Sequence, residues 1–311
     1  MGSLPMSGSA RLVPRVSVLM TAYNREAYIG EAIESVLGQT YTDFELIIVD
    51  DGSKDRTVEV ARKYLSDPRV RVVENEKNLG DYPNRNHAST FARGEYLKFH
   101  DSDDVMYDDC LRVMVSALDS TPSAAMALTS SRAWPGARCP MVLTPQLAFE
   151  REFLGIGLFQ LGPACALIRR RAFEDLGRFP LIGLHSDSVF WLTVCRRFDV
   201  VLVRGDLFWY RVHDGQELGV TSGRERLDAS LQFESRRWAA LFEDDCPLPE
   251  PVRDIARRNV AYLQFKDVIR EVRAGALSNA ARRVTSGGIS IAQWLRYLRR
   301  PRRRWDAGTP Q

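Results

Sequence analysis

The sequence predicts an α/β fold with a mostly parallel sheet flanked by helices, followed by a helical C-terminal extension. Short apolar runs of strand length alternate with segments in which apolar residues recur every three or four positions. This alternation of strands and helices is typical of parallel sheets covered by helices on both faces. Two of the predicted strands run directly into acidic residues, and the last part of the chain shows only helical periodicity.

Four strands and three helices can be followed in order along the first part of the chain. Ile29, Ile33 and Val36 mark the buried face of the first helix, and Gly38 ends it. The predicted strands cover residues 16–20, 44–49, 70–73 and 95–100, and the helices between them cover 29–37, 58–65 and 83–93. A helix at 111–118 and a strand at 124–129 follow.

The remaining chain becomes irregular and then helical. Residues 130–165 contain proline, glycine and tryptophan with weak periodicity, as expected of loops that shape a pocket. A helix is predicted at 186–197 and strands at 200–203 and 207–212. Beyond residue 224 we predict only helices, at 227–242, 252–272 and 289–298.

The composition is that of a globular protein without membrane spans. The chain has 311 residues, of which 45% are hydrophobic and 27% charged. No apolar run is long enough for a membrane helix, and none before the first strand resembles a signal peptide. The five cysteines form no CxxC pair, so we expect buried thiols in the reducing cytoplasm rather than a zinc site or a disulfide framework.

The charge is distributed unevenly along the chain. Residues 251–311 carry 14 Lys and Arg against 4 Asp and Glu, whereas the preceding residues carry 29 against 36. Between Trp294 and Trp305 aromatic residues are interleaved with arginines. This basic end fits peripheral contact with an anionic membrane or a solvated tail equally well. Non-specific nucleic-acid binding is a weaker alternative, and we expect no specific nucleic-acid partner.

Acidic residues gather where two of the predicted strands end. Asp50 and Asp51 follow one strand, and Asp101, Asp103 and Asp104 follow another. Carboxyl ends of parallel strands meet at one edge of a sheet, which is where open α/β sheets bind ligands. Three carboxylates within four residues repel one another and favour a bound cation, and Mg²⁺ or Mn²⁺ held there can bind a diphosphate. The pattern predicts a nucleotide site without a phosphate-binding glycine loop, since no GxxxxGK occurs.

Four segments together resemble family 2 glycosyltransferases of the GT-A (nucleotide-diphospho-sugar transferase) fold. They are Val16–Arg25 (VSVLMTAYNR), Ser35–Tyr41 (SVLGQTY), Glu45–Ser53 (ELIIVDDGS) and His100–Asp104 (HDSDD), and the likeness covers roughly residues 14–215. The resemblance implies transfer of a sugar, with inversion, from a nucleoside diphosphate sugar, for which we expect a UDP-sugar. It also implies Mn²⁺ or Mg²⁺ as cofactor and a hydroxyl of a saccharide or lipid-linked acceptor, as in the synthesis of cell-surface polysaccharides or glycoconjugates.

The resemblance assigns roles to individual residues. Those expected around the nucleotide-sugar are Thr21, Ala22, Tyr23, Glu26, Asp50, Asp51, Gly52, Arg85 and Asp101. Asp103 is expected to bind the metal most directly, and His213 to close over the diphosphate or metal. Structural alternatives remain open: Thr21 and Tyr23 as turn residues, and Arg85 as the partner of a helix acid. Asp104 is expected to cap the following helix, and metal binding is the alternative for this residue.

An inverting transfer needs a base that deprotonates the acceptor hydroxyl. In the family this base is the Asp of a Glu-Asp pair that opens a helix, and here Ser186-Asp187 stands at that place. Asp187 is therefore the expected base, Ser186 departs from the pattern, and helix capping by both is the alternative. The QxxRW motif of processive members is also altered, with Glu234 where Gln would stand before Arg237-Trp238. We expect one sugar to be transferred per encounter.

These expectations divide the chain into a flexible N-terminus (1–13), a nucleotide-sugar-binding half (14–129), an acceptor-binding half (130–223) and a basic helical extension (224–311). Two alternatives to a transferase remain. A non-catalytic module that binds nucleotide sugar would explain Ser186. A sugar-1-phosphate nucleotidyltransferase would need a glycine-rich loop with an arginine after the first strand, where this chain has Thr-Ala-Tyr-Asn. We expect a cytoplasmic protein, peripheral at the inner face of the membrane if the basic end binds lipid.

Overall fold

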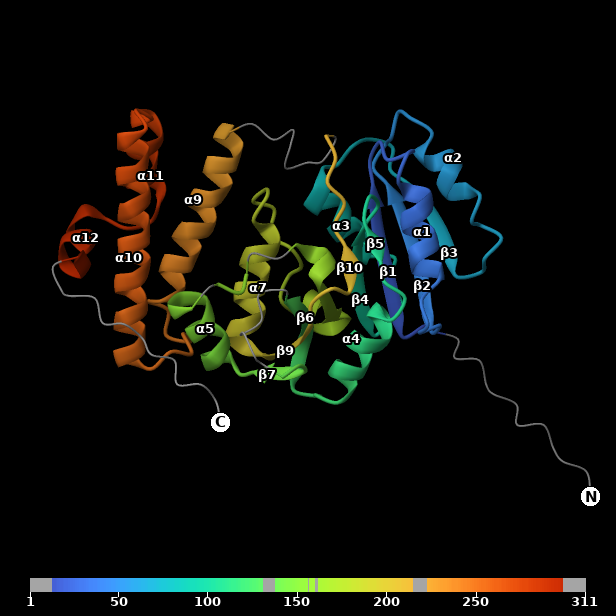
Figure 1. Cartoon of the computed structure of the whole chain (residues 1–311), viewed down its shortest axis with the longest axis horizontal. Helices are drawn as coiled ribbons and strands as arrows, with labels where there is room; N and C mark the ends of the chain where they lie inside the picture. The colour runs from blue at the N-terminus through green and yellow to red at the C-terminus, as the bar shows by residue number, and fades with distance from the viewer. Residues whose placement is uncertain (1–12, 131–137, 156, 160–161, 215–222, 299–311) are drawn as a thin grey trace, which may run out of the picture.

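One eight-stranded sheet forms the centre of the protein (Figure 1). The computed structural model describes residues 13–130, 138–155, 157–159, 162–214 and 223–298, so nearly all of the predicted flexible N-terminus and the basic residues after 298 lie outside it. The strands are β1 (Val16–Ala22), β2 (Phe44–Asp50), β3 (Val70–Glu74), β4 (Tyr96–Asp101), β6 (Ala124–Ser130), β7 (Met141–Leu143), β8 (Ala166–Arg169) and β9 (Asp199–Arg204). Their order across the sheet is β3-β2-β1-β4-β8-β6-β9-β7. A separate antiparallel pair joins β5 (Val105–Met106) to β10 (Phe208–Trp209).

The sheet is mostly parallel, which confirms the predicted fold class. β1 runs parallel to β2 and β4, β2 to β3, and β6 to β9. β8 lies antiparallel between β4 and β6, and β7 is antiparallel to β9. The sequence did not predict β8, although this strand joins the two parts of the sheet into one continuous surface.

Helices cover both faces of the sheet. One face packs against α1 (Ile29–Leu37), α2 (Thr57–Arg62) and α4 (Cys110–Asp119). The other packs against α3 (Asp81–Ser89), α5 (Pro145–Leu154), α6 (Arg170–Asp175) and α7 (Ser186–Arg197). β2 is buried along its whole length, as expected of a strand covered on both sides.

An aromatic cluster packs α7 against β4. The ring of Phe179 lies 5.1 Å from Phe99 of β4, 5.0 Å from Phe173 of α6 and 5.2 Å from Phe190 of α7. Tilted and edge-on ring pairs at such distances add stabilisation to the burial of apolar area. We call these four residues the Phe179 cluster. It fixes the distance between the strand that carries Asp101 and the helix that carries Asp187.

The segment 130–165, predicted as loops, contains ordered elements. β7 and α5 form there, together with the short 3₁₀ helix η1 (Pro163–Cys165). Pro145, which suggested a loop, is the first residue of α5, where proline is favoured because its missing N–H has no helical partner. Thr144 caps this helix by accepting a hydrogen bond from the N–H of Leu147. The predicted strand 207–212 is also shorter, since only β10 pairs within it.

The C-terminal extension is helical, as predicted. It consists of α9 (Gly223–Ala240), α10 (Glu250–Arg273), α11 (Leu277–Ser286) and α12 (Ile291–Leu298), which stand at one end of the molecule (Figure 1). The prediction did not include α11, which has few apolar residues to show its period. Arg283 of α11 pairs with Glu234 of α9 at 3.0 Å, and Trp238 of α9 packs on Tyr297 of α12.

Candidate active site

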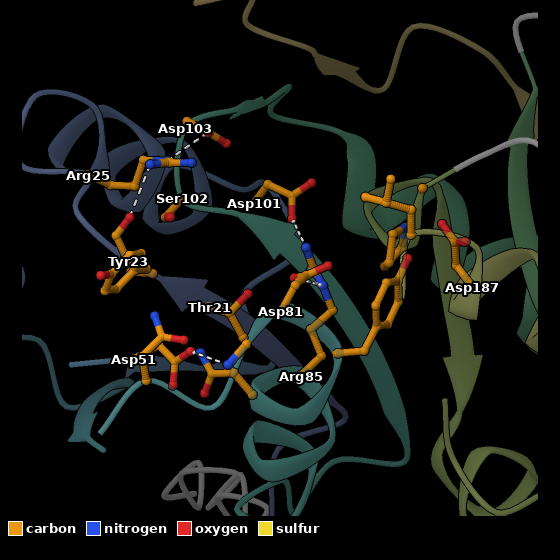
Figure 2. Close-up of a pocket in the computed structure, with 18 of the residues that line it drawn as sticks. Thr21, Tyr23, Arg25, Asp51, Asp81, Arg85, Asp101, Ser102, Asp103 and Asp187 are labelled. Atoms are coloured by element: carbon orange, nitrogen blue, oxygen red, sulfur yellow. Dashed lines mark hydrogen bonds and ion pairs between the residues drawn. The ribbon is translucent and has the colours of Figure 1, made fainter. Parts of the chain in front are cut away.

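A cavity of about 1000 Å³ opens at the carboxyl ends of β1, β2 and β4 (Figure 2). The strand register places Thr21 beside Asp101 and Ala22 beside Asp50, so the two groups of acids end at one edge of the sheet. One wall comes from residues 21–25, Asp51, the start of α3 and residues 101–103. The opposite wall is formed by Gly162, Pro163, Leu184, His185, Asp187 and Ser188.

The two acids after β2 have different surroundings. Asp51 lines the cavity, and its carboxylate accepts hydrogen bonds from the Asn75 side chain at 2.8 Å and from the N–H of Gly80 at 2.9 Å. Asp50 lies outside the lining, and its Oδ2 accepts from the N–H groups of Gly52 and Ser53 at 3.0 and 2.9 Å. Asp50 therefore shapes the turn that presents Asp51.

Gly52 is required by the geometry of this turn. Its φ is +77°, a conformation that side chains other than glycine rarely adopt. A Cβ there would also stand 3.3 Å from the backbone nitrogen of Asn78. The backbone can consequently run close to the loop between β3 and α3, whose residues Asn78 and Gly80 line the cavity.

Arg85 holds two carboxylates on the cavity wall. Its Nε donates to Asp81 and its Nη2 to Asp101, both at 2.7 Å. Burial would raise the pKa of Asp101, but the charge and hydrogen bond of Arg85 outweigh it and keep that pKa below its ordinary value. Arg85 thus pairs with a helix acid, as the structural alternative had it, and at the same time lines the cavity. Figure 2 shows Arg85 reaching from α3 toward Asp101.

Asp103 has two basic neighbours. Its Oδ2 lies 2.9 Å from the Nε of Arg25 and 3.0 Å from the Nε2 of His213. The ring of His213 packs on Tyr28 at 4.4 Å. The sequence suggested no role for Arg25, although this residue stands inside the first of the four motifs.

The segment that follows β10 lies over the acidic residues. The backbone N–H of Arg211 donates to Asp104 at 3.0 Å, and its Nε donates to the carbonyl of Asp103 at 2.9 Å. Burial, together with the charge of Asp101, raises the pKa of Asp104 to about 7. The expectation that Asp104 caps a helix is wrong, because the next helix, α4, begins only at Cys110.

Asp103 and His213 supply ligand types that suit a divalent cation. A carboxylate oxygen and an imidazole nitrogen both bind Mn²⁺, and Mg²⁺ commonly takes one or two carboxylates and completes its shell with phosphate oxygens and water. Within the described residues no group of three His, Cys, Asp or Glu side chains is arranged to hold a metal. These residues therefore fit a metal that is shared with a bound diphosphate, rather than one enclosed by protein alone.

Asp187 faces the cavity from the opposite wall. It stands in the first turn of α7 and is buried, and Figure 2 shows it well apart from Asp103. Burial raises the pKa of its carboxyl to about 7, against hydrogen bonds from Ser188 and from the Tyr82 hydroxyl. Oδ1 accepts the N–H of Ser188 at 2.6 Å. A carboxyl with such a pKa can take up a proton near neutral pH.

The residues next to Asp187 are fixed by neighbouring elements. The hydroxyl of Ser186 donates a hydrogen bond to the carbonyl of Gly183 at 2.7 Å and closes the turn before α7. Ser186 has no carboxylate, and its side chain does not cap the helix. The ring of His185 stacks on Phe233 of α9 at 5.3 Å, and its Nε2 lies 3.2 Å from the hydroxyl of Ser230. The C-terminal extension therefore supports this wall of the cavity.

Lys98 supports the same wall from within the sheet. Its side chain is fully buried, and its Nζ donates to the carbonyl of Phe99 at 3.1 Å and to that of Ala164 in η1. These bonds hold Gly162 and Pro163 at the cavity. A single lysine inside a predicted strand gives no signal of this role, so sequence reasoning missed it.

The structure brings most of the expected site residues to one cavity. Those that line it are Thr21, Ala22, Tyr23, Asp51, Arg85, Asp101, Asp103 and Asp187. Asp50, Gly52, Glu26 and His213 are not among the lining residues. Glu26 accepts the N–H of Arg56 at 2.9 Å, whereas His213 reaches the site through Asp103. Across the parts of the chain that the structure describes, no helix has the length and apolar character needed to cross a bilayer.

Known proteins resemble this chain in sequence and in fold. Chondroitin synthase from Escherichia coli is 37% identical over 127 residues, which are 40% of this chain and 18% of that protein. TarS 1–349 from S. aureus, solved with UDP-GlcNAc, superposes with a TM-score of 0.62 at 21% identity, covering 91% of this chain and 79% of TarS. The mannosyltransferase PcManGT from Pyrobaculum calidifontis, solved with GDP-Man and Mn²⁺, gives 0.58 at 19% identity, covering 92% and 79%.

The chain spans less than a fifth of chondroitin synthase, and its likeness to the solved structures concerns the fold. The model of one family, however, matches residues 17–177, which are more than half of the chain. The match covers all of β2 and β4 and all of β1 except Val16, and these are the strands that end at the cavity. The matched family is described as glycosyl transferase family 2. The chain belongs to this family and has a GT-A fold.

Proposed function

We propose that this enzyme transfers one sugar per encounter, with inversion, from a UDP-sugar to a hydroxyl of a saccharide or lipid-linked acceptor. The observation that carries the proposal is the position of Asp187. A buried carboxyl with a pKa of about 7 faces the same cavity as Asp51, Asp101 and Asp103. One wall thus offers groups for a nucleotide, and the other offers a base for the acceptor.

On the donor side, Asp51 is the proposed partner of the base or ribose, with residues 21–23 around it. Gly52 and Asp50 keep this turn in shape, and Glu26 fixes the neighbouring loop through the N–H of Arg56. Arg85 and Asp101 form a rigid pair under the ribose and diphosphate. Asp103 and His213 are the residues that would hold Mn²⁺ or Mg²⁺, which when bound offsets the negative charge of the leaving diphosphate.

On the acceptor side, Asp187 would remove the proton of the attacking hydroxyl. Only its ionised form can do so, and at neutral pH about half of the carboxyls with a pKa near 7 are ionised. His185, Leu184 and Pro163 stand around it and would contact the acceptor. Because Ser186 stands where the family has Glu, Asp187 is the ionisable residue of this dipeptide.

The surroundings of Trp238 favour single transfers over processive synthesis. In this chain Arg237 pairs with the buried Glu152 at 2.8 Å, and Trp238 is buried against Tyr297. Neither residue lines the cavity, so neither is placed to hold a growing saccharide. The proposal includes a cytoplasmic location, with the basic C-terminal extension toward the inner face of the membrane.

The proposal of uridine as the nucleoside of the donor is supported by TarS, which was solved with UDP-GlcNAc. Guanosine is the alternative, because PcManGT was solved with GDP-Man. Thermal-shift measurements with UDP, GDP and their sugar conjugates, each with and without Mn²⁺, compare the two directly, since ligands that bind the folded state raise the melting temperature. A larger shift with GDP than with UDP would refute the choice of base.

The catalytic assignment can be tested without knowing the acceptor. Slow donor hydrolysis in the presence of Mn²⁺ should fall by about 10²–10⁴-fold in Asp187→Asn, while UDP binding is kept. Asp103→Asn should instead lose the part of UDP affinity that depends on Mn²⁺. Asp175→Asn, an exposed carboxyl on α6, is the matched control. Unchanged turnover in Asp187→Asn would exclude this base, and UDP binding without turnover in the native chain would favour the non-catalytic alternative.

A further inference from the structure

One side of α12 exposes a pair of apolar residues. Ile291 is 63% exposed and Leu295 52% exposed. Because they are four residues apart on a helix, their side chains lie one above the other. Trp294 and Tyr297 of the same helix are buried. A single exposed apolar side chain is common, but an aligned pair on a terminal helix forms a surface.

The exposed pair extends the buried face of α12. With 3.6 residues per turn, five apolar residues of α12 occupy neighbouring positions on one arc of the helix. In order around the helix they are Tyr297, Trp294, Leu298, Ile291 and Leu295. Tyr297 packs on Trp238 of α9 at 5.6 Å, and Trp294 on Phe265 of α10 at 6.2 Å. The apolar arc is thus wider than these contacts, and α12 stands at the outer edge of the helical end (Figure 1).

All charged residues in the sequence around α12 are basic. From Val272 to Trp305 it contains nine arginines and no Asp or Glu. Arg282 and Arg283 pair with Asp228 and Glu234 of α9. Arg296 is exposed beside Leu295, and residues 299–304 add five further arginines in sequence. An apolar arc bordered by cations is the pattern of helices that lie in a membrane interface, and anionic lipids attract such cations.

We propose that α12 binds the surface of an anionic lipid bilayer, with Ile291 and Leu295 entering the boundary between headgroups and acyl chains. The charge argues against a second copy as the occupant, because α12 carries Arg296 and no acidic residue, so two such helices face to face would repel each other. The inference goes beyond the proposed transfer, since a bilayer can be bound without donor or acceptor. It would keep the enzyme at the surface where a lipid-linked acceptor is found.

The test is co-sedimentation of the full chain with vesicles of phosphatidylcholine alone or mixed with phosphatidylglycerol. Binding to the anionic vesicles is expected, and it should weaken as added salt screens the arginines. The double variant Ile291→Ser/Leu295→Ser should bind about tenfold less tightly, because it loses apolar area that the bilayer would cover. The matched control is Leu65→Ser/Val142→Ser, which changes an apolar residue in the turn after α2 and one in β7 that are 49% and 43% exposed.

Three results would overturn the proposal. Equal binding of the two double variants would show that α12 has no part in it, and equal binding to both kinds of vesicle would remove the role of charge. A dimer in sedimentation velocity that the α12 variant abolishes would assign this face to a second copy. Circular dichroism confirms that the variants are folded. Donor hydrolysis in solution should be the same in all variants. Hydrolysis therefore tests the proposed transfer, and vesicle binding tests the proposed membrane contact.

Discussion

Replacing Tyr82 with phenylalanine should move the pH dependence of catalysis to higher pH. Burial raises the pKa of Asp187 to about 7, and the Tyr82 hydroxyl is one of the hydrogen bonds that oppose this rise. A hydrogen bond to a charged group contributes about 1.5 kcal/mol, which corresponds to roughly one pKa unit. Without it the Asp187 pKa should approach about 8, while the phenyl ring still fills the buried space.

The assay is the rate of donor hydrolysis or transfer at saturating donor across the neutral pH range. With a pKa near 7, the ionised fraction of Asp187, and hence the rate, should rise about tenfold between pH 6 and pH 8 in the native chain. In Tyr82→Phe the midpoint should lie roughly one pH unit higher, with a similar plateau. Tyr64→Phe is the control, because it removes a hydroxyl 2.7 Å from the Glu34 carboxylate outside the cavity.

A profile that does not change in Tyr82→Phe would show that the Tyr82 hydroxyl does not act on the carboxyl of Asp187. A native rate that is flat from pH 5 to pH 8 would be more damaging, because a base with a pKa near 7 must lose activity over that range. An equal shift in Tyr64→Phe would indicate a general effect of the substitution and not one through Asp187.

Three further predictions concern stability. Asp187 has a raised pKa in the folded state, so the stability that comes from its neutral form is present below about pH 4 and is lost as the pH rises through about 7. At pH 8 the free energy of unfolding of Asp187→Asn, measured in urea, should therefore exceed that of the native chain by at most about 4 kcal/mol, and this difference should disappear in acid. Arg85→Met leaves Asp101 without its cation and should lower the free energy of unfolding by about 3–5 kcal/mol in urea, with recovery in the double variant Arg85→Met/Asp101→Asn. Phe179→Ala should cost about 3–5 kcal/mol in thermal unfolding, whereas Phe242→Ala, at a site 42% exposed, should cost far less.

The sequence predicted the parts of the fold that depend on local pattern. Strands buried on both faces read as continuous apolar runs, and α1 shows a regular apolar face ended by Gly38. β8 and α5 were missed for physical reasons. β8 has only four residues and is held in place by the strands on both sides of it. A proline that starts a helix, as in α5, cannot be distinguished by sequence from a proline in a loop.

The site was predicted where motifs end strands, and less well where side chains meet across the fold. The acids at 50–51 and 101–104 share one edge because parallel register requires it. Which of these carboxylates turns into the cavity depends on the backbone N–H groups nearby, and no local pattern shows that Gly52 and Ser53 hold Asp50. Arg25 and Lys98 likewise gain their positions from contacts with Asp103 and Ala164, which are distant in sequence.

β8 has a consequence for engineering. Exchanging acceptor specificity between relatives would seem simple if the chain were cut after residue 129, between the two predicted halves. Such a chimera would separate β6 from β8, its antiparallel partner, and would divide the Phe179 cluster between two parents. A graft confined to residues 162–163 and 184–188 would change the wall that we propose for the acceptor and leave every strand pair intact. The unit that can be recombined in this enzyme is therefore the cavity wall and not the half-chain.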